Sequence, residues 1–284
     1  MTIKNNVTVL LTTCDRYNTT LPLCLLSLLN QTRRPDRIVI VDDSLNNKFY
    51  ENYQIKQLLI LAKYKNIIID YYLGERKGQV PALQRGFEKI KEGWILKVDD
   101  DNVLEPDVIE IFEKNISPEV GAMGGIIVID ENAYSRKIEN INASSKIKDI
   151  YTHFNIQMIY NQDNEPKAVE HLYSNYFFRK EALNSYELNL QPSSYREDTI
   201  TTHAIYQNNY KLIVYSEAKT YHLTTDNGNK KWGSKHEAKN ERFFLQKLND
   251  WKVIPDNLKV IEDKDRIYTV FNNTNYLILD KKYE

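Results

Sequence analysis

The sequence predicts an α/β fold with a mostly parallel central sheet flanked by helices. Short apolar runs that suit strands alternate with helix-like segments through the first hundred residues, a pattern typical of parallel sheets with right-handed crossovers. Polar or acidic residues directly follow three of these apolar runs. Because ligands bind beyond the carboxyl ends of the strands in such sheets, these clusters predict a binding site there.

The composition is that of an ordinary globular protein. The chain has 284 residues, of which 42% are hydrophobic and 27% charged, enough for one large α/β domain with or without an appendage. The net charge of −1 provides no basic field, so we do not expect nucleic acid as a partner. The two cysteines, Cys14 and Cys24, cannot build a disulfide framework and suit a reducing compartment.

We expect no targeting segment at the beginning of the sequence. Residues 1–6 are polar and lead directly into a strand-like run, which is not the pattern of a signal peptide. The apolar run at residues 21–29 is too short to span a bilayer. We therefore expect a cytoplasmic protein whose contact with the inner face of a membrane is at most peripheral.

The first half contains four predicted strands separated by helices. The first two apolar runs are short and continuous, as in strands that are buried on both faces. The predicted strands are Val7–Leu11, Arg37–Val41, Asn66–Tyr71 and Trp94–Val98. The first predicted helix is capped by Thr19 or Thr20, has Pro22 in its first turn, and carries Leu21, Leu25, Leu28 and Leu29 on one face. The second predicted helix is Gln54–Lys63, and the third carries Leu83, Phe87 and Ile90 on one side. Gly74–Gly78 is predicted to be a loop.

The second half is less regular. A helix is expected to open at Pro106. The run Val120–Ile129 is a predicted strand in which Gly124-Gly125 allows close packing. Strand-like stretches at Val169–Phe178 and Leu212–Tyr215 flank a helix that starts near Arg196. The tail holds a loop at Thr224–Ser234, a helical piece at Lys235–Leu248, and a hairpin made of Ile267–Phe271 and Tyr276–Leu279.

Three adjacent carboxylates, Asp99, Asp100 and Asp101, follow the fourth predicted strand. Such a cluster repels itself unless a cation neutralises it, and in extended backbone Asp99 and Asp101 point to the same side. Oxygen ligands of this kind suit Mg²⁺ or Mn²⁺. The alternative is a solvated acidic turn before the next helix. The polar clusters Thr12-Thr13 and Asp42-Asp43, expected at the same edge of the sheet, favour the metal.

Four stretches, in this order, are similar to motifs of one enzyme family. They are VTVLLTTCDRY, RIVIVDDS, GQVPALQRGF and LKVDDDNVLEPDVI, which together cover most of residues 7–112. They resemble the inverting glycosyltransferases of family 2, whose fold is called GT-A. Further along, Tyr195–Thr199 resembles the family's downstream acidic motif, and Tyr221-His222 resembles its late histidine.

The resemblance implies a metal-dependent enzyme that moves a sugar from a nucleotide-sugar onto an acceptor hydroxyl. The cofactor would be Mn²⁺ or Mg²⁺. By family frequency we expect a UDP-sugar as the donor, and a glycan, a lipid-linked molecule or a protein as the acceptor. Two other functions stay open. A nucleotidyltransferase would be expected to carry a glycine-rich basic loop after the first strand, where TTCDRY has no glycine. A non-catalytic relative would only bind a glycan.

The resemblance also implies roles for residues at the donor site. Asp43 would bind the nucleotide base, Asp99 or Asp100 the ribose, and Asp101 the metal on the diphosphate. His222 is either a second metal ligand or a hydrogen-bonded structural histidine. Family members often have Ala-Arg-Asn-x-Gly where this chain has residues 82–86, ALQRG, so Arg76, Lys77 or Arg85 is expected to substitute for the missing arginine. The remaining predicted donor contacts are Thr12, Thr13, Asp15, Arg16, Lys77 and Gly78.

Asp198 is the predicted catalytic base, with Glu197 as a neighbouring positioning carboxylate. An acceptor hydroxyl is a poor nucleophile and needs a base as it attacks the anomeric carbon. Ser193 or Ser194 is expected to start a helix whose first turn holds both acids and stabilises their anions. The alternative is that these acids are ordinary choices for the first turn of a helix.

The predicted organisation is one GT-A catalytic domain followed by an extension. Residues 1–102 would bind the nucleotide-sugar and residues 103–225 the acceptor. Residues 226–284 would supply a lid loop and a C-terminal extension. In that loop, Trp232 and the adjacent lysines either close over the donor or belong to a solvated surface loop.

Overall fold

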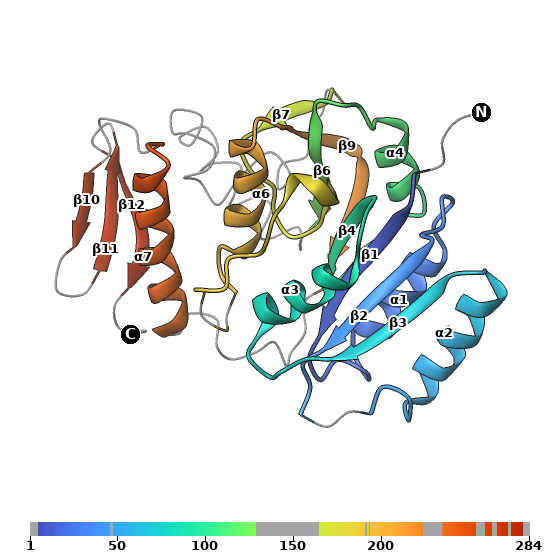
Figure 1. The fold of residues 1–284 in the computed structure, drawn as a ribbon. Helices are drawn as coiled ribbons and strands as arrows, with labels where there is room; N and C mark the ends of the chain where they lie inside the picture. Colours follow the sequence, from blue (N-terminus) through green and yellow to red (C-terminus); the bar gives the residue numbers. More distant parts are fainter. Residues whose placement is uncertain are drawn as a thin grey trace.

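The computed structural model describes residues 5–45, 48–128, 165–190, 192, 194–223 and 235–253, together with three strands between residues 259 and 280. A central sheet carries helices on both faces, and a separate three-stranded sheet lies beyond α7 (Figure 1). None of the described helices combines the length and the apolar composition needed to cross a membrane.

The first half of the chain builds the parallel part of the central sheet. Its strands are β1 (Val7–Thr13), β2 (Arg37–Asp42), β3 (Ile68–Leu73) and β4 (Trp94–Asp99), and they lie in the order β3-β2-β1-β4. Its helices are α1 (Leu21–Leu29), α2 (Tyr53–Tyr64) and α3 (Gln79–Lys89). All three strand pairs are parallel, which confirms the predicted alternation of strands and helices.

The second half adds mostly antiparallel strands. Its elements are β5 (Asn102–Leu104), α4 (Val108–Lys114), β6 (Val120–Val128), β7 (Lys167–Val169), β8 (Tyr176–Arg179), a 3-10 turn at Lys180–Ala182, α6 (Glu197–Gln207) and β9 (Lys211–His222). The sheet continues from β4 through β8, β6 and β9 to β5. The pairs β4–β8, β6–β8 and β5–β9 are antiparallel, whereas β6–β9 is parallel.

The single strand expected over Val169–Phe178 is wrong, because the structure divides this stretch into β7 and β8. Between them the Ser174 amide donates to the Asp198 carboxylate rather than to a neighbouring strand, and Ser174 has a φ of 59°. The short strand β5 was not expected. The contacts of Ser174 with Asp198 therefore interrupt the strand, and the local apolar pattern from which we predicted one strand does not show this break.

The C-terminal elements agree with the predicted helix and hairpin. They are α7 (Lys235–Asp250), β10 (Lys259–Glu262), β11 (Arg266–Phe271) and β12 (Thr274–Asp280). The three strands form an antiparallel sheet in the order β10-β11-β12. The predicted lid at Thr224–Ser234 lies outside the described residues and stays a prediction.

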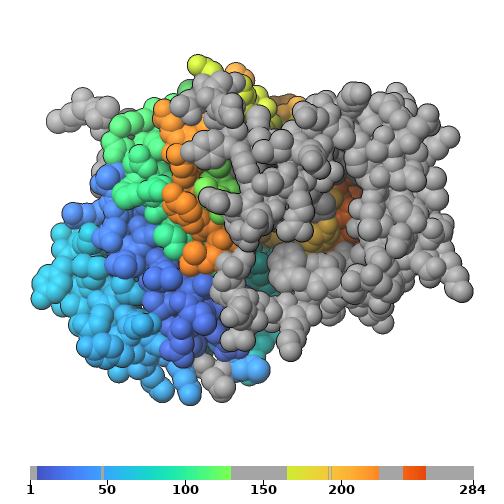
Figure 2. All heavy atoms as spheres, turned by 180° about the vertical axis from the view of Figure 1, so that it is seen from behind, coloured from blue at the N-terminus to red at the C-terminus, as the bar shows by residue number. Residues whose placement is uncertain are grey.

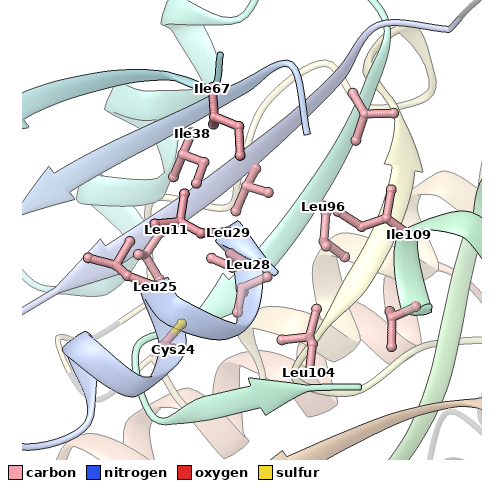
Figure 3. Close-up of a cluster of buried hydrophobic side chains, with 14 of the residues drawn as sticks. Leu11, Cys24, Leu25, Leu28, Leu29, Ile38, Ile67, Leu96, Leu104 and Ile109 are labelled. Carbon is pink, nitrogen blue, oxygen red and sulfur yellow. The ribbon is translucent and has the colours of Figure 1, made fainter. Parts of the chain in front are cut away.

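The core consists of two layers, one on each face of the central sheet. Along β1, Val9 and Leu11 face α1, whereas Leu10 faces α3, because successive strand residues point to opposite faces. On the α1 face, leucines of that helix pack against Leu11 and Ile38, and Leu104 and Ile109 extend the cluster (Figure 3). The strands β1, β2 and β4, whose carboxyl ends carry the polar clusters, are thus buried on both faces.

Gly125 allows β6 to pack closely against β9, as the sequence predicted for the Gly124-Gly125 pair. A Cβ atom at this position would lie 2.0 Å from the carbonyl oxygen of Ala218. We therefore expect Gly125→Ala to lower the free energy of unfolding by about 1–3 kcal/mol, the usual cost of overpacking. Urea denaturation measures this change. Gln54→Ala on the exposed side of α2 is the control, and equal midpoints for the two variants would contradict the prediction.

Candidate active site

A cavity of about 640 Å³ opens at the carboxyl ends of β1, β2 and β4, within the size range of ligand sites. The start of α6 and the end of β9 complete its wall. The predicted site residues that line it are Thr12, Thr13, Asp15, Arg16, Asp43, Gly78, Asp99, Asp100, Asp101, Glu197, Asp198 and His222. Lys77 is not among the lining residues, because its side chain is 67% exposed and its Nζ lies 2.7 Å from Glu75 Oε2.

The pairing of β5 with β9 brings His222 to the acidic cluster. Asn102 is the register partner of His222, and the amide of Leu223 donates to the carbonyl of Asp101 over 2.8 Å. On the rear face of the molecule, β9 runs beside the residues of β5 and α4 (Figure 2). Two residues that are far apart in the sequence are therefore held together by backbone hydrogen bonds.

Asp101 and His222 have the geometry of two ligands to one divalent ion. Asp101 Oδ1 lies 3.7 Å from His222 Nε2. Bonds of about 2.1 Å would place two ligand atoms roughly 3.0 Å (cis) to 4.2 Å (trans) apart. Asp101 Oδ1 and His222 Nδ1 are buried and have no hydrogen-bond partner in the described part of the chain. These residues fit a metal ion that would complete its shell with other ligands.

No group of three or more histidine, cysteine, aspartate and glutamate side chains among the described residues is arranged to hold a metal ion. Mg²⁺ bound at nucleotide sites commonly has one or two carboxylate ligands and takes the rest from phosphates and water. The pair formed by Asp101 and His222 is consistent with an ion that binds together with a diphosphate.

Asp100 lies between the strand ends of β1 and β4. It accepts a hydrogen bond from the Thr13 hydroxyl over 2.7 Å. Burial, together with the neighbouring Asp101 carboxylate, raises the pKa of Asp100 to about 7, whereas the Thr13 bond and the charge of Arg16 oppose the shift. The cavity is thus rich in carboxyl groups that a cation would stabilise in their charged form.

Asp43 is enclosed by the loop between β3 and α3. Its carboxylate accepts hydrogen bonds from the amides of Arg76, over 2.6 Å, and Gly78, over 2.9 Å. A Cβ atom at Gly74 would lie 2.3 Å from Asp43 Oδ1, so the loop needs glycine there. Gly78 has a φ of 102°, a conformation that favours glycine. Two amides of the Gly74–Gly78 loop thus hold Asp43.

Asp198 and Glu197 lie in the first turn of α6 but face different partners. Asp198 accepts hydrogen bonds from the amides of Ser174, over 2.8 Å, and Thr199, over 2.7 Å. Glu197 is 3% exposed and accepts from the Tyr176 hydroxyl over 2.8 Å. Burial raises the pKa of Asp198, and it raises the pKa of Glu197 to about 7, even though the charge of Lys97 opposes both shifts.

The start of α6 differs from the expected serine cap. The residue before the helix is Arg196, which has a φ of 72° and makes no side-chain cap. The Ser194 backbone carbonyl accepts from the amide of Glu197 over 2.9 Å. Ser193 lies outside the described residues. The acids are in the first turn as predicted, but a left-handed turn, rather than a hydroxyl cap, sets their directions.

A comparison with protein families identifies the chain. Residues 8–186, more than half of the sequence, match the model described as glycosyl transferase family 2. The chain belongs to glycosyl transferase family 2. The family indicated by the sequence motifs is therefore confirmed. No curated protein matched the chain.

Solved structures share the fold of this family 2 member at low sequence identity. GalNAc-T7 with UDP, GalNAc and Mn²⁺ has a TM-score of 0.62 and 16% identity, over 87% of this chain and 50% of that one. Mannosyltransferase PcManGT from Pyrobaculum calidifontis, with GDP-Man and Mn²⁺, has a TM-score of 0.58 and 17% identity, over 85% of this chain and 65% of that one. S. aureus TarS 1-349 with UDP-GlcNAc has a TM-score of 0.58 and 14% identity, over 86% of this chain and 65% of that one. The chain thus spans less than two thirds of each of these proteins, and the likeness confirms the predicted GT-A-like α/β fold.

Lys97 is a site residue of this family 2 member to which the sequence analysis assigned no role. Its side chain is 2% exposed, and its Nζ lies 2.8 Å from Asp99 Oδ1 and 3.4 Å from Glu197 Oε2. It also donates to the Ser174 carbonyl over 3.0 Å. Burial lowers the pKa of Lys97, but the carboxylates outweigh this effect and raise it. A lysine inside the apolar run WILKVD was a signal of a buried partner.

Asp42 was also missed as a structural residue of the site. It is 1% exposed and accepts hydrogen bonds from the hydroxyls of Tyr17, Tyr71 and Ser44. The Ser44 hydroxyl accepts in turn from the amide of Asp15 over 2.7 Å. This network joins the loops after β1 and β2, and so fixes the wall of the cavity that carries Asp43.

Proposed function

We propose that this protein is a metal-dependent inverting glycosyltransferase that moves a sugar from a UDP-sugar onto an acceptor hydroxyl. The observation that carries the proposal is that Asp43, Asp101, Asp198 and His222, which come from separate parts of the chain, line one cavity. Structural neighbours that bind UDP, UDP-GlcNAc or GDP-Man support a nucleotide-sugar as the donor. The acceptor class, a glycan, a lipid-linked molecule or a protein, follows from the family resemblance.

The donor would lie along the strand ends. Asp43, fixed by two loop amides, would accept a hydrogen bond from the base, and Asp99 or Asp100 would bind the ribose. Asp101 and His222 would hold Mn²⁺ or Mg²⁺ beside the diphosphate. The bound ion would neutralise charge on the departing nucleoside diphosphate. Thr12, Thr13, Asp15, Arg16 and Gly78 would complete the donor contacts.

Asp198 would remove the proton of the acceptor hydroxyl as that oxygen attacks the anomeric carbon. A general base works best when its pKa approaches the working pH, and burial raises the pKa of Asp198 in that direction. The amides of Ser174 and Thr199 fix the direction of its carboxylate. Glu197, turned toward Tyr176 and Lys97, would position the turn rather than touch the acceptor. A single displacement of this kind inverts the anomeric centre.

A thermal-shift panel tests the donor and the metal together. Wild-type protein is expected to melt at a higher temperature with a UDP-sugar and Mn²⁺ than with either alone, whereas GDP- and dTDP-sugars should have smaller effects. At a ligand concentration a hundredfold above Kd, binding adds about 2.7 kcal/mol to the free energy of unfolding. Asp101→Asn and His222→Ala should abolish the metal-dependent part of the shift.

The control for these variants is Glu110→Gln, a change at an exposed carboxylate of α4. It should keep the full metal-dependent shift. If no nucleotide-sugar shifts the wild-type protein with Mn²⁺ or Mg²⁺, or if Asp101→Asn shifts as much as wild type, the proposed function is contradicted.

A further inference from the structure

The turn that leads into Glu197 and Asp198 has an unusual backbone conformation. Ser194 and Arg196 have φ angles of 57° and 72°, in the left-handed region that costs a residue other than glycine about 1–2 kcal/mol. Arg196 is also the N-cap of α6, and its carbonyl accepts the hydrogen bond of the Ile200 amide over 3.0 Å. Such conformations persist only where the surrounding structure holds them in place.

The C-terminal helix α7 supplies the contacts that hold this turn. Arg196 Nε lies 2.8 Å from Glu241 Oε2, and Arg196 Nη2 lies 3.0 Å from Glu241 Oε1, so the carboxylate binds the guanidinium at two points. Both side chains are 3% exposed. The guanidinium carbon also lies 4.1 Å from the centre of the Phe244 ring, one helical turn further along α7. A planar fork bound at two points fixes orientation as well as position.

We propose that Glu241 is a positioning residue for sugar transfer: through Arg196 it holds the left-handed turn that directs Asp198 into the cavity. The inference rests on the proposed role of Asp198 as the base. Asp198 and Glu197 are adjacent and both line the cavity, but the Asp198 carboxylate accepts from the Ser174 and Thr199 amides, whereas the Glu197 carboxylate points toward Tyr176 and Lys97. Rotation of the first turn of α6 would exchange these directions. The element that sets this direction lies outside residues 8–186, which match the family model.

A second ion pair of α7 distinguishes positioning from simple attachment. Lys247 Nζ lies 2.7 Å from Glu187 Oε2, which belongs to the segment before the turn. Both ion pairs anchor α7, but the pair with Glu241 includes Arg196, a residue of the turn itself. Loss of attachment alone should therefore affect Glu187→Gln and Glu241→Gln in the same way.

The experiment compares Glu241→Gln with the matched control Glu187→Gln in the full-length protein. In Glu241→Gln we expect kcat for nucleotide release from a UDP-sugar with Mn²⁺ to fall by about tenfold to a hundredfold, while KM for the donor stays within about twofold. Amide hydrogen exchange in residues 195–202 should become faster by about tenfold. Glu187→Gln should keep wild-type kcat and wild-type exchange in that segment, even if its melting temperature falls.

Arg196→Lys is the second variant, since lysine keeps the charge but cannot bind at two points. It should show the same fall in kcat at unchanged donor KM, to a smaller extent. Unchanged kcat and exchange in both Glu241→Gln and Arg196→Lys would overturn the inference, and so would equal effects of Glu187→Gln and Glu241→Gln on exchange in residues 195–202. If the wild-type protein releases no nucleotide from any donor, the proposed function fails, whereas the exchange comparison still decides whether Glu241 holds the turn.

Discussion

Asp198→Asn is expected to lower kcat for sugar transfer by about 10²- to 10⁴-fold, the usual contribution of a general base. Asparagine has the shape of aspartate but can keep only one of the two amide hydrogen bonds, because the Ser174 and Thr199 amides donate to different oxygens and asparagine has a single carbonyl oxygen. It cannot accept the proton of the acceptor hydroxyl. Donor binding should change little, because the residues proposed to contact the nucleobase of the donor and the metal on its diphosphate are Asp43 and Asp101. Steady-state kinetics and a donor thermal shift measure the two quantities separately.

The control for Asp198→Asn is the same chemical change at Asp107, an exposed residue before α4 whose side chain makes no cap. Asp107→Asn should retain wild-type kcat and wild-type donor binding. If Asp198→Asn retains more than about a tenth of the wild-type kcat, another group removes the proton. If Asp198→Asn abolishes donor binding instead, the residue belongs to the donor site.

The parallel half of the fold was predictable because local patterns determine it. Apolar runs such as Val7–Leu11 and Arg37–Val41 have no polar face to alternate, so they had to be strands that are buried on both sides. The acids that follow such runs had to share one edge of the sheet. The structure places Asp43 and Asp101 there, in one cavity.

The remainder depends on contacts between distant segments that no local pattern encodes. His222 reaches Asp101 only because β9 pairs with the three-residue strand β5. Arg196 adopts a left-handed conformation beside Glu241, a residue of another helix. Local sequence instead favoured a serine cap at this place. The family resemblance predicts Asp198 as the catalytic base, but only the fold shows what orients its carboxylate.

Lys97→Met is expected to lower the free energy of unfolding by about 3–5 kcal/mol, the typical cost of removing one partner from a buried ion pair. Methionine fills most of the same space but leaves the Asp99 and Glu197 carboxylates without their shared cation. Lys97 lowers the pKa of both acids and of Asp198, so each pKa should rise in the variant. Urea denaturation at several pH values measures the loss. Lys114→Met, which breaks the exposed pair with Glu110, is the matched control and should change stability little.

The pH dependence and a double variant separate uncompensated charge from lost packing. A buried acid whose pKa is raised in the folded protein favours folding when it is protonated. The loss in free energy of unfolding caused by Lys97→Met should therefore become smaller as the pH falls through the raised pKa of Glu197. Lys97→Met with Glu197→Gln removes one of the two uncompensated charges. The double variant should therefore be more stable than Lys97→Met alone at neutral pH, although Glu197→Gln in the wild-type background removes a partner of Lys97. Additive losses in the double variant, or a deficit that does not change with pH, would mean that Lys97 supports the site by packing and that its charge has no part in holding Asp99 and Glu197.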